Sequence, residues 1–209
     1  MDDVIMINIL GSNMLGFGDN NKFKKKKERV ESTLIMLRSF VSRIDNYIHR
    51  LEEREKQLFE KVVDLTTMGD DARAMIVAGE IQQIRSVLRH LTALRYIMEG
   101  IVLKIENYIA IGEAMGSIGP ALSALREIRG VFKGLIPSIE MEAQLIENSL
   151  RDLISSTGEY IPPTTWYSPQ STNEAKKILE EAYAVAEKRL RETFPQVKRS
   201  SEKNSMEIR

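Results

Sequence analysis

Two long heptad patterns constrain the fold of this 209-residue chain more than any other feature. In both patterns, apolar side chains recur at steps of three and four, and neither stretch contains proline. The first pattern, interrupted only by Glu55, comprises Val30, Leu34, Leu37, Val41, Ile44, Ile48, Leu51, Leu58, Val62 and Leu65. The second, interrupted only by Arg95, comprises Val77, Ile81, Ile84, Leu88, Leu91, Met98, Val102, Ile105 and Ile109. Such spacing predicts two helices, each on the order of 60 Å long, that pair along a narrow seam.

The segment between the two patterns is short enough to make the helices antiparallel neighbours. Its sequence is TTMGDDARA (66–74), in which Gly69 can close the first helix and Asp70 or Asp71 can cap the second. Beyond the second pattern, residues 112–138 carry repeated glycines and prolines, which predict short helical pieces. The predicted joints are Gly112, Gly116, Gly119, Pro120, Gly130, Gly134 and Pro137. A further helix should follow Ser138, its expected cap.

The sequence therefore predicts an all-α fold in which short glycine-jointed helices pack on a long antiparallel hairpin. The expected core, residues 22–156, holds the hairpin at about 28–111, the short helices at 118–135 and an acidic helix at 138–155. An apolar segment, 1–21, precedes this core. A proline-bearing linker, 157–172, and a flexible tail, 173–209, with one amphipathic helix at 173–194 follow it.

Composition excludes several classes of site and protein. The absence of cysteine removes disulfides, thiolate metal sites and cysteine nucleophiles. No apolar run approaches the roughly 20 residues that cross a bilayer. A secretory signal has basic residues before its apolar run, whereas Asp2 and Asp3 precede the apolar residues 4–10. We therefore expect a cytoplasmic protein. The two histidines, His49 and His90, do not follow a glutamate at the spacing of helical di-iron sites. We expect His49 to be a surface residue and His90 to be structural. Phosphate-binding loops and nucleophile elbows are also missing, so we expect neither an enzyme nor a cofactor or metal.

Charge is distributed unevenly along the chain. Residues 22–61 hold twelve basic and seven acidic side chains, a net of +5, whereas residues 137–159 hold one basic and five acidic, a net of −4. With Leu34 at heptad position a, seven of the basic residues fall at positions c and g, on one flank of the first helix, and none of the seven acids does. We call these seven residues the basic stripe: Lys22, Lys26, Arg29, Arg43, Arg50, Arg54 and Lys61. Lys24, Lys25 and Lys27 complete a lysine cluster at its beginning.

Sorting of charge to one flank favours a binding face over a merely solvated one. Its partner could be anionic lipid head groups, nucleic acid phosphates, or an acidic segment of the same chain or of a neighbour. Sparse aromatic residues and the lack of a nucleic-acid-binding module disfavour nucleic acid. Membrane is favoured because the apolar residues 4–10 precede the lysine cluster, a combination that stabilises peripheral attachment. Alternatively, residues 4–10 form a small strand or pack on the hairpin.

This layout resembles the ESCRT-III family, and within it the archaeal cell-division proteins of the CdvB type. The resemblance covers roughly residues 22–155 and rests on the order of helices and charges. It implies a non-enzymatic protein that polymerises with copies of itself and with related ESCRT-III paralogues. The resulting filaments would lie on the inner face of the cell membrane, at the division site. Such filaments constrict and sever anionic membrane, in cell division or vesicle budding. The alternative is a coiled-coil adaptor that bridges protein partners without touching lipid.

The resemblance also implies two further sites. An AAA-type ATPase with a microtubule-interacting-and-transport domain would dismantle the filament after binding the tail. The candidate residues are Ile161, Pro162 and Pro163 in a strand, or Leu179, Val185 and Leu190 in the terminal helix. The leucines that the family places on either side of Leu190 are Ala186 and Thr193 here. The acidic segment would fold back on the basic hairpin in a closed monomer, through Glu140, Glu142, Glu147 and Asp152. Residues after 172 do not match a winged-helix segment, so we expect a shorter paralogue.

Overall fold

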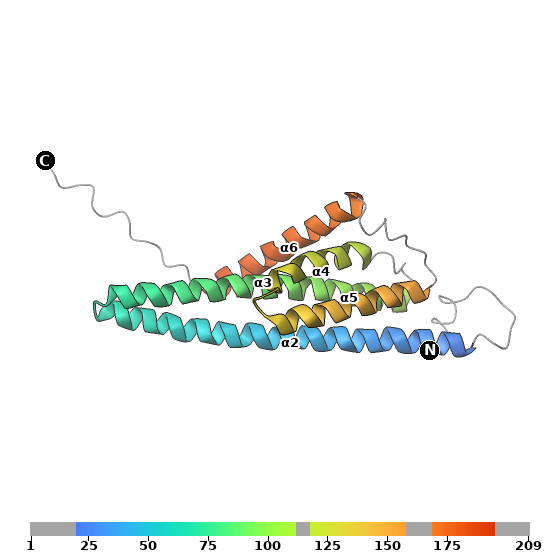
Figure 1. Cartoon of the computed structure of the whole chain (residues 1–209), viewed down its shortest axis with the longest axis horizontal. Coiled ribbons are helices and arrows are strands. Elements are labelled where there is room, and N and C mark those ends of the chain that lie inside the picture. The colour runs from blue at the N-terminus through green and yellow to red at the C-terminus, as the bar shows by residue number, and fades with distance from the viewer. Residues whose placement is uncertain (1–19, 112–117, 158–168, 195–209) are drawn as a thin grey trace.

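The computed structural model describes residues 20–111, 118–157 and 169–194, and all of these elements are α-helices. The helices are α2 (Asn20–Thr67), α3 (Asp71–Ile111), α4 (Gly119–Phe132), α5 (Pro137–Thr157) and α6 (Pro169–Thr193). The helices α2 and α3 form a long antiparallel hairpin, and the shorter helices pack along part of its length (Figure 1). The predicted all-α, ESCRT-III-like fold is confirmed. Within the described residues, no helix combines the length and hydropathy that crossing a membrane requires.

The turn between α2 and α3 uses the residues that the sequence indicates. Gly69 has a φ of 77°, in the left-handed region that glycine adopts without steric cost. The amide of Asp70 donates to the carbonyl of Leu65 at 2.9 Å, a bond typical of a glycine-terminated helix. The Asp70 carboxylate accepts from the amide of Arg73 at 3.1 Å and so caps α3. Because α2 begins at Asn20, Lys22 lies within the helix, as the register of the basic stripe requires.

The seam between α2 and α3 buries the predicted apolar residues, and both interruptions of the pattern are ion-paired. Glu55 is only 1% exposed and accepts from Nε and Nη2 of Arg85 at 2.8 and 2.6 Å. Arg95 contacts Asp45 at 2.6 Å and Glu99 at 3.0 Å. Since an unpaired buried charge is strongly destabilising, the pair between Glu55 and Arg85 favours this alignment of the two helices. The pair between Asp45 and Arg95 also joins the helices, but its side chains are 44% and 29% exposed and it contributes less.

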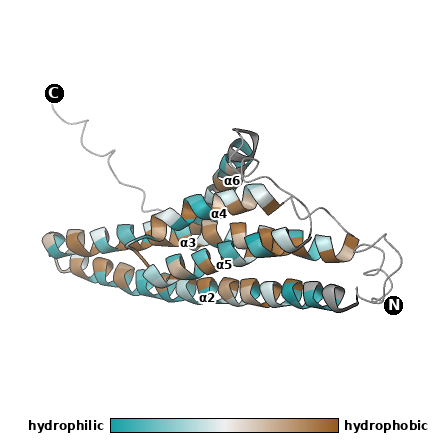
Figure 2. Ribbon diagram, turned by 45° about the vertical axis from the view of Figure 1, so that its right-hand side comes forward, coloured by the Kyte–Doolittle hydropathy of each residue, from teal (hydrophilic) through white to brown (hydrophobic). Residues whose placement is uncertain are grey.

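The short helices complete one continuous core with the middle of the hairpin. Phe40, Leu94, Phe132 and Ile146, from four different helices, are almost completely buried in it. Each helix carries both apolar and polar faces (Figure 2). The hairpin tip has a separate small cluster, formed by Leu58, Val77 and Ile81, and projects beyond the other helices (Figure 1).

Two local expectations differ from the structure. The chain does not break at Gly130, because α4 continues through it to Phe132. A glycine inside a helix costs only about 1 kcal/mol, which the burial of Leu125, Ile128 and Phe132 offsets. Ser138 is not the residue before α5, since α5 begins at Pro137; its hydroxyl instead lies 3.3 Å from that of Tyr47 on α2.

The amphipathic helix expected in a flexible tail, α6, packs on the core. It contacts α3 and α4, and begins at Pro169, within the segment expected to be a linker. Its buried residues include three alanines, Ala175, Ala182 and Ala186, and Phe194, directly after the helix, is also buried. Alanines let the helix backbones approach closely but bury little apolar surface, so this contact was hard to foresee from hydrophobic periodicity.

Candidate functional site

The acidic helix α5 lies on the flank of α2 that carries the basic stripe. The two helices run antiparallel, as three contacts show. The Arg43 Nε donates to Glu142 Oε2 at 2.8 Å, Tyr47 Oη lies 3.3 Å from Ser138 Oγ, and Ser149 Oγ contacts Met36 Sδ at 4.0 Å. The residues on α2 that meet α5 occupy heptad positions c and g, as the stripe does. The middle of the stripe, at Arg43, therefore contacts the segment predicted to fold back on it and stays partly exposed.

The contact between Arg43 and Glu142 is specific in position but weak in energy. The two side chains are 44% and 33% exposed, and Arg43 also donates to Ser39 Oγ at 2.7 Å. A pair this accessible to water contributes about 0–1 kcal/mol. Packing of apolar residues such as Phe40 beneath it, rather than the ion pair, therefore holds α5 on α2.

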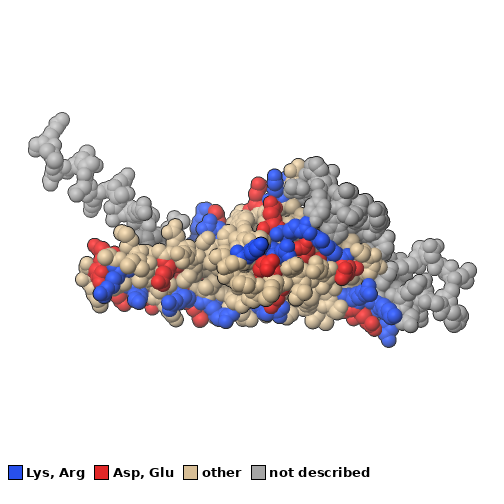
Figure 3. Space-filling model, in the orientation of Figure 1, with Lys and Arg blue, Asp and Glu red and all other residues tan. Residues whose placement is uncertain are grey.

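Other residues of the stripe lie on either side of α5. Arg50, Arg54 and Lys61 are exposed toward the hairpin tip, and the Arg50 guanidinium lies 4.7 Å from the ring centre of Tyr47. Toward the beginning of α2, Arg29 is exposed. Lys24 and Lys25 are also exposed, and Lys27 is half-buried. Basic side chains gather at this end of the molecule (Figure 3). The side chains of Lys22 and Lys26 lie outside the described residues.

A polar cleft lies between α2 and α5 at the same end. Its volume is about 570 Å³, and its lining includes Arg29, Ser32 and Thr33 from α2 and Ser149 and Asp152 from α5. Asp152, a predicted member of the fold-back segment, thus shares this cleft with Arg29 of the stripe. Both ends of α5 consequently place a carboxylate near a stripe arginine.

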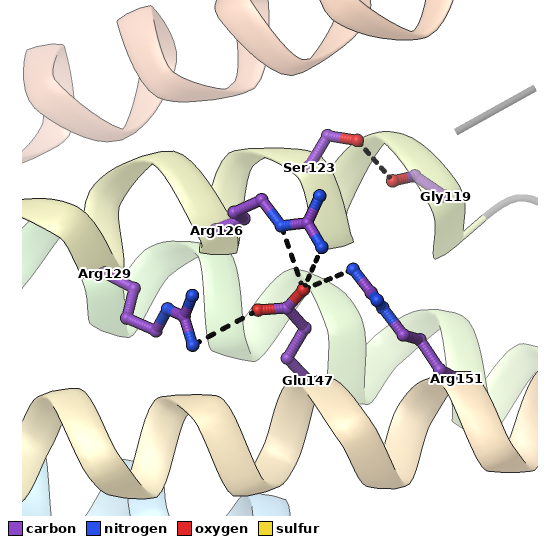
Figure 4. Close-up of polar contacts among 6 residues, drawn as sticks. All are labelled: Gly119, Ser123, Arg126, Arg129, Glu147 and Arg151. Carbon is purple, nitrogen blue, oxygen red and sulfur yellow. Dashed lines mark hydrogen bonds and ion pairs between the residues drawn. The ribbon is translucent and has the colours of Figure 1, made fainter. Parts of the chain in front are cut away.

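Glu147, another predicted member, faces α4 instead of α2. It is only 3% exposed and lies among three arginines (Figure 4). Its carboxylate is 2.9 Å from Arg126, 3.6 Å from Arg129 and 2.5 Å from Arg151. Glu147 therefore joins α4 to α5. The remaining predicted acid, Glu140, is half-buried in the first turn of α5. The sequence offered one signal for this cluster: Glu147 lies on the apolar face of α5, next to Ile146. A carboxylate buried on such a face needs a cationic partner.

The candidate ATPase-binding residues of α6 are partly covered. Leu179 and Leu190 are half-buried against the core, while Val185 is 42% exposed. Arg189, beside Leu190, lies 3.7 Å from Glu52 of α2. The candidate strand residues Ile161, Pro162 and Pro163 lie outside the described residues. Access to Leu190 by a partner would thus require α6 to move.

A contact between a histidine and a tyrosine connects α6 to α3. The sequence pattern did not predict this pair. His90 Nδ1 lies 3.1 Å from Tyr183 Oη, and the two rings meet edge to face with centres 5.7 Å apart. Burial and, to a smaller extent, the neighbouring Arg89 guanidinium lower the pKa of His90. Burial also raises the pKa of Tyr183. Because 93 positions separate the partners, no local pattern could have indicated this contact.

Comparison with known proteins agrees with the class that this fold defines, an ESCRT-III-like helical protein. The chain is 33% identical over 181 residues to cell division protein B1 of Sulfolobus acidocaldarius, and the match covers 83% of each chain. It is 29% identical to cell division protein B of that organism, over 85% of this chain and 69% of the relative. Cell division protein B3 is 27% identical, over 81% and 97%. The chain belongs to the cell division protein B family. No family model and no solved structure matches it.

Proposed function

We propose that this protein is a non-enzymatic subunit of a filament that assembles on anionic membrane and remodels it during cell division. The division role rests on the relatives, which are named cell division proteins. Membrane binding rests on the basic stripe of α2, where each basic residue near an anionic surface contributes about 1 kcal/mol. The lysine cluster at the beginning of α2 would extend this surface.

The observation that carries the proposal is the position of α5 on the stripe. Glu142 forms an ion pair with Arg43, and Asp152 shares a cleft with Arg29. An acidic helix therefore lies where anionic lipid would bind. A flank that favours carboxylates also favours phosphates, since both are oxygen anions that arginine binds in the same way. We therefore interpret the structure as a closed form, in which lipid first meets the uncovered residues and Arg43 becomes available when α5 moves away.

Filament partners follow from the same interpretation. Several relatives, cell division proteins B, B1 and B3, occur in one organism, which supports assembly with paralogues as well as with copies of this chain. An AAA-type ATPase would bind the tail through Leu179, Val185 and Leu190 once α6 leaves the core, or through residues 161–163. The polymer would lie on the inner face of the cell membrane.

Sedimentation with liposomes tests lipid binding. Two variants on the same exposed part of α2 form a matched pair: Lys61→Glu changes the stripe, whereas Lys56→Glu changes a lysine on another face. We expect binding to anionic vesicles and little binding to neutral vesicles. We also expect binding to weaken clearly in Lys61→Glu and more strongly in Arg54→Glu/Lys61→Glu, with little change in Lys56→Glu. Equal binding to neutral vesicles, or equal losses in the matched pair, would refute the stripe as the lipid-binding face.

Negative-stain microscopy tests the filament. Coated tubes or polymers on anionic vesicles are expected. Discrete rods under all conditions would instead favour an adaptor that spaces protein partners, for which the rigid ion-paired hairpin is also suited.

A further inference from the structure

The docking of α6 on α3 and α4 combines buried alanines, half-buried apolar side chains and one titratable pair near the middle of the helix. Three of the buried residues of α6 are alanines, which bury little apolar area. The larger side chains at this contact are the half-buried Ile178, Leu179 and Leu190. Tyr183 also contacts His90, and the ring centre of Phe194 lies 5.2 Å from the Arg85 guanidinium. The ion pair between Arg189 and Glu52, at 3.7 Å, is partly exposed and contributes little.

The surroundings of His90 disfavour a positive charge. On its own helix, the neighbouring Arg89 is cationic. From α4, Phe132 presents an edge-to-face ring at 6.5 Å, and Glu127 acts on Tyr183 rather than on His90. The α6 helix contributes the Tyr183 hydroxyl. Glu187 and Arg191 of α6 line a separate cleft, together with Arg85 and Arg89 of α3. The half-buried imidazole thus meets a phenol, a second ring and a cation at short range.

We propose that the protonation state of His90 controls the docking of α6, so that α6 is held at neutral pH and released as the pH falls. With a neutral imidazole, Tyr183 donates its hydroxyl proton to Nδ1 and both polar groups are satisfied. Protonation does not by itself break the contact, because Nδ1–H can then donate to the phenol oxygen. It places a charge in a poorly hydrated site beside Arg89, and undocking relieves that cost by returning the imidazolium to water.

The direction and limit of the effect follow from proton linkage. The docked form binds a proton less readily than the undocked form, in which His90 titrates near the ordinary value of about 6.5. Docking strength is therefore complete above that pH and declines as the pH falls below it, until the docked form is protonated as well. At pH 5.5, one unit below the ordinary value, the undocking equilibrium can rise by at most about tenfold. We expect a several-fold rise.

Release of α6 would uncover Leu190 and the α3 and α4 surfaces beneath the alanines. A pH signal would thus act on the segment proposed to contact the ATPase, whereas the basic stripe on α2 would be unaffected. The test uses no lipid, so its outcome is independent of the liposome experiment.

The absence of cysteine allows specific labelling. Spin labels on Asn107→Cys in α3 and Ala184→Cys in α6, both exposed positions, report docked and undocked populations by their distance distribution. Between pH 7.5 and 5.5 we expect the undocked population to grow several-fold in the labelled protein. The same growth is expected when the exposed His49, which pairs with Glu53 on its own helix, is changed to Gln. The His90→Gln variant should show no pH dependence. Persistence of the dependence in His90→Gln, or its loss in His49→Gln, would overturn the proposal.

A second measurement covers the case in which His90→Gln does not dock at all. The chain has only two histidines, so their imidazole signals can be followed by nuclear magnetic resonance and assigned with His49→Gln. We expect the pKa of His90 to lie below the ordinary value of about 6.5, and Ala182→Leu, which should force α6 off the core, to bring it back toward that value. A pKa of His90 at or above the ordinary value in the unmodified chain would contradict the proposal.

Discussion

Replacement of Glu147 by glutamine should weaken the fold far more than the same change at Glu142, although both acids lie on α5 and each contacts arginine at 2.5–2.9 Å. Glu147 is 3% exposed and joins three arginines, whereas the Glu142 side chain is 33% exposed and joins one. Loss of one partner from a buried ion pair costs about 3–5 kcal/mol. The three arginine side chains around Glu147 are 21–37% exposed and can regain water, which reduces the expected loss for Glu147→Gln to about 2–3 kcal/mol.

Urea unfolding followed by circular dichroism measures this difference. With a typical urea slope of about 2 kcal/mol per molar, Glu147→Gln should lower the midpoint by about 1 M or slightly more. Glu142→Gln should lower the free energy of unfolding by less than about 1 kcal/mol. If the two variants differ by less than about 0.5 kcal/mol, the buried cluster does not hold α4 to α5 and the reasoning from burial is wrong.

Three further perturbations test the hairpin and the docking of α6. Arg85→Leu leaves Glu55 buried without its partner and should lower the free energy of unfolding by about 3 kcal/mol, measured by thermal unfolding. The double variant Glu55→Leu/Arg85→Leu should regain most of that loss, and an equally unstable double variant would contradict this. Gly69→Ala places a side chain at a φ of 77° and should cost about 1 kcal/mol in the same assay, so an unchanged midpoint would argue against the left-handed turn. Ala182→Leu adds bulk at a completely buried position of α6 and should speed limited proteolysis within α6 while the hairpin stays protected; unchanged cleavage would show that the alanines do not set the contact.

The sequence predicts the hairpin well because the seam is encoded locally. Heptad spacing identifies the two helices, and Gly69 and Asp70 identify the turn. The interruptions at Glu55 and Arg95 could also be located, although their partners could not. The partners Arg85 and Asp45 lie on the opposite helix, so their identity depends on how the two helices align.

Contacts between segments that are distant in the sequence were harder to predict. Glu147 is one of several acids in α5, and only its place on the apolar face separates it from those that face α2. The docking of α6 relies on alanines and on the contact between His90 and Tyr183, and neither produces a strong periodic signal. The amphipathic pattern of residues 173–194 indicates an apolar face, but it does not show that this face packs on α3 and α4. The predicted separate tail is therefore the largest difference from the structure.

The central claim is that positions c and g of α2 form the face that meets anionic membrane. Single cysteines at Gln57, a c position, and at Val63, a b position, test this without altering the charge, because both residues are exposed and uncharged. Each cysteine would carry a fluorophore that brominated lipid quenches on contact, and the protein would be mixed with anionic vesicles. The account predicts strong quenching at Gln57 and weak quenching at Val63. Equal quenching at both positions, or stronger quenching at Val63, would contradict it.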